Sequence, residues 1–277
     1  MSNKSYDVIG DIHGYASELI KMLNKLGYIN DGNGFFHPDN RIVVFTGDYV
    51  DGGNENLEVI DIVMKMVKRQ SAKAILGNHD FNIICFNKNV PGSNTQYLRK
   101  HSRANSLQCL TTQSEIDLKP EKGKAALEFL MSLPLWLELD GLRFVHAHWD
   151  TEAMKSLSLY MNNDNILSEY GYFKASAGQG EYGDARSSIL SGPEIECKPY
   201  RDRFGIERKK DRLKWWNNNQ SHNNIPIFFG HYAMKPPLKI INNTICVDAG
   251  IAKGRSIAAY RHTVGENLKN ENFIYSE

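Results

Sequence analysis

The chain has 277 residues, 41% of them hydrophobic and 23% charged, and a formal net charge of +1. This composition is typical of an ordinary globular protein, which can bury a sizeable core without disulfides or structural metals. The nearly neutral charge excludes a general attraction to nucleic acids or membranes, and we expect neither as a partner. The polar N-terminus and the strand-length apolar runs predict a cytoplasmic protein with no signal peptide and no membrane span.

The first part of the chain alternates predicted strands and helices. Three short apolar runs that stop at glycines predict buried strands at residues 6–9, 41–46 and 74–76. Apolar residues at helical spacing predict helices at residues 15–26 and 57–67 between them. This order is typical of a largely parallel sheet, in which functional side chains gather where the strands end.

The rest of the chain is less regular. A helix is expected at residues 125–131, then a β-hairpin over residues 135–147, because Asp140-Gly141 between apolar runs is a strong turn signal. Residues 151–192 are expected to be irregular around one or two helices. Short apolar runs predict further strands at residues 225–229, 238–241, 244–247 and 256–261. We therefore expect a single domain over residues 1–277 with two sheets packed together.

Polar side chains that can bind metals follow five of the predicted strands. In chain order these side chains are Asp11 and His13, Asp48 and Asp51, Asn78 and His79, His146 and His148, and His231. Asp11 and His13 are two residues apart, so in an extended segment both side chains point to the same face. Carboxylate, amide and imidazole groups together suit ions such as Mn, Fe or Zn.

Each cluster also has an ordinary structural interpretation. Asp11 could cap the helix that begins near Tyr15, and Asn78 could cap a later helix. Asp48 and Asp51 could belong to a hydrogen-bonded, glycine-rich turn. A single histidine after a strand is more often a satisfied polar residue than a ligand. Because all five clusters occur together, we predict a two-cation site that suits phosphoryl transfer to water.

In chain order the clusters read GDIHG, GDYVDGG, GNHD, HAH and GHY. This series resembles the calcineurin-like metallophosphoesterases, in the branch of Ser/Thr protein phosphatases and symmetrical diadenosine tetraphosphatases. The segment from Phe228 to Tyr260, with VDAG at residues 247–250, is similar to the C-terminal part of the tetraphosphatases. The resemblance covers most of the chain except residues 85–125 and 151–224. It implies an αββα fold, in which two packed mixed β-sheets are flanked by helices.

The resemblance also implies a dinuclear metal site and a mechanism. We expect two divalent cations, Mn²⁺ first, with Fe or Zn as the other candidates. The implied ligands, from the first cation to the second, are Asp11 and His13, the bridging Asp48, and then Asn78, His146 and His231. A metal-bound hydroxide would attack phosphorus. His79, oriented by Asp51, would protonate the leaving alkoxide.

Two positions depart from the family pattern. Gly52 stands where the family has a phosphate-clamping arginine, and His148 stands where the family has glycine. A guanidinium matches the geometry of phosphate well, so the absence of this arginine leaves the class of substrate undetermined. We expect residues 151–224 to form a substrate-facing cap that supplies a replacement. The candidate substrate contacts are Arg186, Arg201, Arg203 and His148, although the basic run from residue 201 to 214 could equally be a solvated loop.

Three functions remain open at this stage. The first choice is a phosphatase that hydrolyses phosphomonoesters, similar to the protein phosphatases. The alternative within the enzyme class is a dinucleoside tetraphosphate hydrolase. The third is a non-catalytic, metal-bound binding module, which the complete set of ligands and the His79–Asp51 pair argue against. The expected partner is therefore a phosphorylated substrate: a phosphoprotein, a nucleotide or a small phosphoester.

Overall fold

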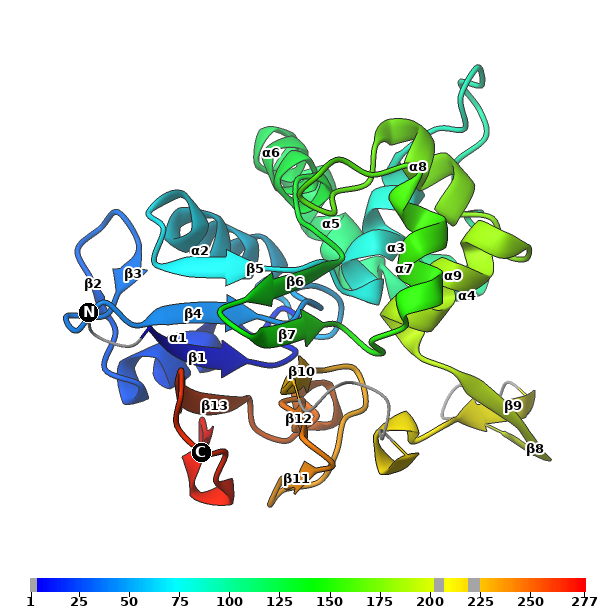
Figure 1. The fold of residues 1–277 in the computed structure, drawn as a ribbon. Coiled ribbons are helices and arrows are strands. Elements are labelled where there is room, and N and C mark those ends of the chain that lie inside the picture. Colours follow the sequence, from blue (N-terminus) through cyan, green and yellow to red (C-terminus); the bar gives the residue numbers. More distant parts are fainter. Residues whose placement is uncertain (1–3, 202–206, 219–224) are drawn as a thin grey trace.

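The computed structural model describes residues 4–201, 207–218 and 225–277. Two five-stranded sheets lie next to each other (Figure 1). The first has the order β14 (Phe273–Tyr275), β13 (Ala258–Thr263), β1 (Ser5–Ile9), β4 (Ile42–Phe45), β5 (Ala72–Ala74). The second has the order β11 (Ile240–Ile241), β12 (Thr244–Cys246), β10 (Ile227–Phe229), β7 (Leu142–Val145), β6 (Trp136–Leu139).

Both sheets mix parallel and antiparallel pairs. Strand β1 runs parallel to β4 and antiparallel to β13. Strand β7 runs parallel to β10 and antiparallel to β6, across the predicted Asp140-Gly141 turn. The two residues of this turn have φ angles of 50° and 77°, the left-handed values that a tight hairpin turn requires. The predicted fold class, two packed mixed sheets with flanking helices, is confirmed.

Alternating side chains along the strands build two separate cores. Val8, Val44 and Phe228 point between the sheets and are fully buried in one apolar cluster. Their neighbours, such as Ile9 and Phe45, point to the opposite faces and belong to a larger cluster shared with the helices. Successive side chains of a strand face opposite ways, so each sheet can be covered on both sides.

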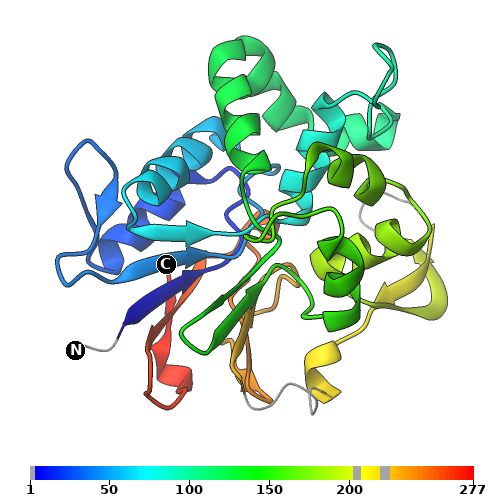
Figure 2. The ribbon, with the colours of Figure 1, turned by 45° about the horizontal axis from the view of Figure 1, so that its top comes forward.

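Helices α1 (Ala16–Lys25) and α2 (Asn56–Lys68) confirm the two predicted amphipathic helices and pack on the outer face of the first sheet (Figure 1). The other helices gather beyond the strand ends on the side away from the N-terminus (Figures 1 and 2). They are α3 (Asn78–Asn87), α4 (Arg103–Gln108), α5 (Leu110–Leu118), α6 (Pro120–Met131), α7 (Thr151–Ser158), α8 (Glu169–Ala175) and α9 (Glu181–Ser191). Within the described residues, no helix is long and apolar enough to cross a membrane.

Small elements complete the chain. They are the hairpins β2 (Ile29–Asn30) with β3 (Phe35–Phe36) and β8 (Glu194–Arg201) with β9 (Glu207–Arg212), and the 3₁₀ turns η1 (Trp215–Asn218), η2 (Ile251–Lys253) and η3 (Asn270–Asn272). The third predicted strand is displaced, because β5 ends at Ala74. The backbone N–H of Leu76 donates to the carbonyl of Pro134 at 2.8 Å, so this apolar residue leaves the first sheet.

The prediction of irregular structure with one or two helices at residues 151–192 was wrong. The described structure has the three short helices α7, α8 and α9 there. Asp150 caps α7 by accepting hydrogen bonds from the backbone N–H groups of Glu152 and Ala153, and Ser168 caps α8 through Gly171. Asp and Ser before a helix are favoured caps. These two residues were therefore the signal in the sequence that could have revealed the helices.

Asp7 on β1 is a buried carboxylate whose removal should destabilise the fold. It is fully buried and bonds Arg41 at 3.0 Å and Arg261 at 2.9 Å. Burial alone would raise its pKa, but the two guanidinium groups lower it below the usual value. We expect Asp7→Asn to lower the free energy of unfolding at pH 7 by about 3 kcal/mol, because it leaves two cations without their partner. Urea unfolding would measure this.

The pH dependence follows from the lowered pKa of Asp7. Its stabilisation is present above the unfolded pKa of about 3.9 and is lost as pH falls through the lower folded value. The wild type and Asp7→Asn should therefore converge in stability in acid. Asp31→Asn is the matched control, since Asp31 pairs with Arg69 at the surface and its loss should matter little. Equal effects of the two substitutions would contradict the prediction.

Candidate active site

The side chains that the sequence predicts as a metal site lie together where strands of both sheets end. Asp11 and His13 follow β1, and Asp48 and Asp51 follow β4. Asn78 and His79 begin α3, and His146 follows β7 directly. His231 lies two residues after β10. Segments far apart in the sequence thus meet at one place, as expected for strand ends that share an edge.

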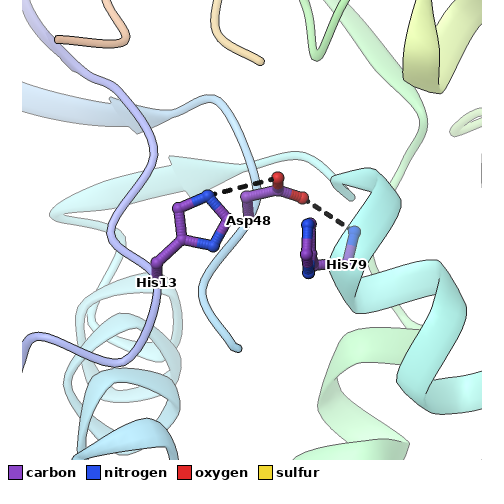
Figure 3. A group of neighbouring side chains, drawn as sticks. All are labelled: His13, Asp48 and His79. Carbon is purple, nitrogen blue, oxygen red and sulfur yellow. Dashed lines mark hydrogen bonds and ion pairs between the residues drawn. The ribbon is translucent and has the colours of Figure 1, made fainter. Parts of the chain in front are cut away.

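Asp48 stands at the centre of this group. One carboxylate oxygen lies 3.6 Å from Nε2 of His13, and the other lies 3.4 Å from Nε2 of His146. The second oxygen also accepts a hydrogen bond of 2.9 Å from the backbone N–H of His79. Figure 3 shows Asp48 between the rings of His13 and His79. Asp48 belongs to both groups of possible metal-binding side chains in the described residues, with His13 and His79 and with His146 and His231.

Asn78, His146 and His231 form the other half of the site. The side-chain oxygen of Asn78 lies 3.0 Å from Nε2 of His146 and 2.7 Å from Nδ1 of His231. The backbone N–H of His231 donates to both carboxylate oxygens of Asp11 at 3.1 Å, which joins this half to the first. The six predicted ligands therefore form one continuous cluster.

The orientation of two imidazoles fits cation binding. Nδ1 of His13 lies 3.0 Å from the carbonyl of Val50, and Nδ1 of His146 lies 2.8 Å from the carbonyl of Thr46. With the Nδ1 hydrogens donated there, each Nε2 presents its lone pair toward the carboxylate of Asp48. Two acceptors that face each other repel unless a cation lies between them. Metal-binding histidines commonly donate their second ring N–H to a backbone carbonyl in this way.

The charge of the cluster also fits cations. The side chains of Asp11, Asp48 and Asp248 are all buried. Burial and the carboxylates of Asp248 and Asp48 raise the pKa of Asp11 well above its ordinary value. Buried like charges are costly unless a positive charge compensates them. In the described residues, Nε2 of His231 is buried without a hydrogen-bond partner, while Nδ1 is the nitrogen of this ring that faces the side-chain oxygen of Asn78, at 2.7 Å. The donor set, oxygens and imidazole nitrogens, suits Mn, Fe or Zn.

Four of the predicted site residues have strained backbones. His13, Asp48, Asp51 and His231 have φ angles of 51°, 55°, 66° and 70°, in the left-handed region that non-glycine residues rarely adopt. Such a conformation costs about 1 kcal/mol for each residue, and these four are among eleven non-glycine residues with positive φ in the described part of the chain. The ordinary interpretation of Asp11 as a helix cap is wrong, because Tyr15 precedes α1 and no side chain caps it. The N-cap of α3 is Gly77, not Asn78.

His79 and Asp51 form the pair that the sequence predicts. Nδ1 of His79 lies 2.9 Å from a carboxylate oxygen of Asp51. Burial lowers the pKa of His79, but the carboxylates of Asp48 and Asp51 raise it more, so the net shift is upward. A raised pKa favours the protonated ring, which can donate a proton near neutral pH.

Sequence patterns gave no role to Asp80, which fastens the second cluster to the third. Its fully buried carboxylate accepts hydrogen bonds from the backbone N–H groups of Asp48 at 2.8 Å, Tyr49 at 2.9 Å and Gly77 at 2.9 Å. Burial and the charge of Asp48 raise its pKa to about 7. Its position after GNH was the available signal, but the backbone donors are only apparent in three dimensions.

The expected substitutes for the missing arginine lie in different places. Arg186 on α9 donates to the carbonyl of Ala175 at 3.2 Å, and its guanidinium lies 5.3 Å from the Phe81 ring centre. His148 lies 3.1 Å from the hydroxyl of Ser188. Arg201 is at the exposed end of β8, and Arg203 is outside the described residues. Contact of these four residues with the substrate stays a prediction.

Arg212, in the same basic segment, does reach the site. Its Nη1 donates to the carbonyl of His231 at 3.0 Å. After burial, this guanidinium is the main cause of the lowered pKa of His231. At Gly52, by contrast, φ is 139° and a Cβ atom would lie 3.0 Å from the carbonyl of His13. The backbone here favours glycine, so positive charge enters the site from β9 instead.

Gly230 is packed so tightly against Asp11 that a methyl group should disturb the site. A Cβ atom at Gly230 would lie 2.2 Å from a carboxylate oxygen of Asp11 and 3.0 Å from the hydroxyl of Thr46. We expect Gly230→Ala to weaken Mn²⁺ affinity about 10-fold to 100-fold by displacing Asp11. Isothermal titration with Mn²⁺ would measure this. Gly178→Ala is the control, because a Cβ atom there meets nothing within 4 Å. Equal affinities would refute the expectation.

Comparison with known proteins agrees with this geometry. The sequence profile described as calcineurin-like phosphoesterase matches residues 5–250. An asymmetrical bis(5'-nucleosyl)-tetraphosphatase PrpE from a Geobacillus species is 30% identical over 267 residues, which cover 95% of this chain and 92% of that protein. The protein of the same name from Bacillus subtilis is 25% identical and covers 93% of this chain and 90% of its own length.

Solved structures share the fold at low identity. A candidate diadenosine tetraphosphatase superposes with a TM-score of 0.53 and 14% identity, covering 99% of this chain and 98% of that one. A serine/threonine phosphatase from Saccharomyces cerevisiae superposes with a TM-score of 0.58 and 15% identity, covering 99% and 79%. The chain belongs to the calcineurin-like phosphoesterase family, a family of dinuclear-metal hydrolases of phosphoric esters, and its relatives carry tetraphosphatase names as its motifs predict, although these names specify asymmetrical rather than symmetrical enzymes.

Proposed function

We propose that this protein hydrolyses dinucleoside tetraphosphates. The relatives that align with nearly its whole length carry the name of that activity, specified as asymmetrical, whereas its likeness to protein phosphatases is one of fold. These names favour the alternative function over our first choice from the sequence, a phosphomonoesterase. The structural observation that supports hydrolysis of a phosphoric ester is the central position of Asp48, which faces both histidine groups of a buried cluster, and the names of the relatives supply the substrate.

In the proposed site, six side chains hold two divalent cations, with Mn²⁺ expected and Fe or Zn as alternatives. Asp11 and His13 would hold one cation, Asn78, His146 and His231 would hold the other, and Asp48, which faces both histidine groups, would serve both. When bound, the cations would lower the pKa of water and offset charge on the phosphoryl oxygens. The surrounding fold holds the backbones of His13, Asp48 and His231 in a strained conformation, so these side chains are in place before a cation binds.

The chain's own proton donor in this proposal is His79. The bond between Asp51 and Nδ1 fixes the ring and leaves Nε2 to deliver a proton to the leaving oxygen.

Arg212 is the arginine that we propose as the contact to the substrate phosphates, because its guanidinium lies at His231. Within a single domain, residues 151–224 would form a cap that faces the substrate. Further contacts to the substrate would come from Arg186, Arg201, Arg203 and His148. A cytoplasmic location also remains a proposal.

Product analysis tests this function. Purified protein with Mn²⁺ should convert diadenosine tetraphosphate to ATP and AMP, as the names of the relatives specify, and EDTA should stop the reaction. Two molecules of ADP would instead indicate symmetrical cleavage. A phosphopeptide and bis-p-nitrophenyl phosphate serve as competing substrates. A higher kcat/KM for the phosphopeptide than for diadenosine tetraphosphate would favour the phosphomonoesterase function. No turnover of any substrate with Mn²⁺, Fe²⁺ or Zn²⁺ would favour the non-catalytic binding module.

A further inference from the structure

We infer that α5 carries a positioning residue, Thr112, which holds the His79–Asp51 pair in its working arrangement. Thr112 belongs to the part of the chain, residues 85–125, for which the sequence shows no family motif. The inference rests on the proton-donor role of His79 proposed above. It adds the prediction that this segment controls how well the enzyme expels poor leaving groups.

Thr112 fixes the carboxylate of Asp51. Its side chain is almost fully buried, and its hydroxyl donates to one oxygen of Asp51 at 2.5 Å. The same hydroxyl accepts from the backbone N–H of Asp51 at 3.2 Å. The other carboxylate oxygen is the one that lies 2.9 Å from His79. With one oxygen bonded to Thr112, the carboxylate cannot rotate without losing a buried hydrogen bond.

The bond to Asp51 also sets the orientation of the His79 ring. Because Nδ1 donates its hydrogen to the carboxylate, 2.9 Å away, Nε2 is the ring nitrogen that is left for a substrate.

Helix α5 is itself bound to the N-terminus of α2, which follows the Asp51 loop. The carboxylate of Glu115 accepts from the backbone N–H groups of Asn56 and Leu57 at 2.9 Å, at the N-terminus of α2. It also accepts from the side chain of Asn56 at 2.6 Å. The side-chain oxygen of Asn56 in turn accepts from the backbone N–H of Asp51 at 2.9 Å. This network links α5, α2 and the Asp51 loop, so Thr112 is held firmly relative to Asp51.

The chemistry gives the inference a specific readout. A proton donor speeds expulsion of a basic leaving oxygen, such as phenolate, much more than of a weakly basic one, such as p-nitrophenolate. A residue that only supports the fold would change both rates equally. A positioning residue for His79 should change the ratio of the two rates.

The experiment compares Thr112→Val, His79→Asn and the wild type, each with Mn²⁺, on phenyl phosphate and p-nitrophenyl phosphate. We expect Thr112→Val to lower kcat for phenyl phosphate about tenfold, with p-nitrophenyl phosphate changed less than about twofold and KM unchanged. Gln113→Ala is the matched control. Gln113 is on α5 but accepts from the side chain of Asn87 at 2.9 Å, away from the pair.

A second readout does not depend on turnover. In metal-free protein, the Nδ1 hydrogen between His79 and Asp51 should be protected from exchange, and NMR should show about tenfold faster exchange in Thr112→Val. If this variant matches Gln113→Ala in both readouts while His79→Asn still discriminates between the esters, the inference is overturned and the proposed function stands. If His79→Asn slows both esters equally, the proton-donor role fails, and the inference fails with it.

Discussion

Replacing Asp48 by asparagine is expected to abolish metal-dependent hydrolysis, with kcat/KM at least about a thousandfold below the wild type. Asp48 is the side chain whose two oxygens face His13 at 3.6 Å and His146 at 3.4 Å. An amide keeps the shape but loses the charge and presents an NH₂ group to one side. Cation stabilisation of the transition state is worth several kcal/mol, and each 1.4 kcal/mol is a factor of ten.

Two measurements check this prediction: kcat/KM on the best substrate with Mn²⁺, and bound metal after gel filtration. Asp61→Asn is the control, since Asp61 is half-exposed on α2 and pairs with Lys65 at 2.6 Å. It should keep normal turnover and metal content. An Asp48→Asn protein with wild-type metal content and turnover would remove Asp48 from the site and contradict the dinuclear arrangement.

The sheet architecture was predictable because its signals are local. Alternating or continuous apolar runs that stop at glycines gave β1, β4, β7 and β10 close to their observed bounds. Asp140-Gly141 located the hairpin that turns the chain within the second sheet. The short edge strand β14 and the β8–β9 hairpin were missed. The hairpin carries many charged residues and is mostly exposed, so it has no apolar pattern to detect.

The six residues predicted as metal ligands lie together in the structure, because each follows a strand and the strand ends of two adjoining sheets meet. The residues that hold them in place were not predictable. Asp80 and Thr112 act through backbone groups and side chains that are distant in the sequence. Arg212 lies in a run of basic residues, where only the fold distinguishes it by its bond to His231. Spacing predicts ligands, whereas packing determines their support.

His79→Asn is expected to lower kcat about 10²-fold to 10³-fold while leaving metal content unchanged. The size is that of a general acid. Metal content should survive because the bond from position 79 to Asp48, 2.9 Å long, comes from the backbone N–H, which the substitution keeps. The remaining activity should come from the rest of the site, since removing one catalytic group rarely removes the others' contribution.

Steady-state kinetics and metal analysis of the same sample separate the two possible failures of this prediction. His37→Asn is the control, because His37 follows β3 and its Nδ1 accepts from the backbone N–H of Asp39 at 3.1 Å. It should behave as the wild type. A His79→Asn protein that loses metal together with activity would make His79 a ligand, in line with its place beside His13 and Asp48. Unchanged kcat on a poor leaving group would mean that the proton comes from another side chain or from solvent.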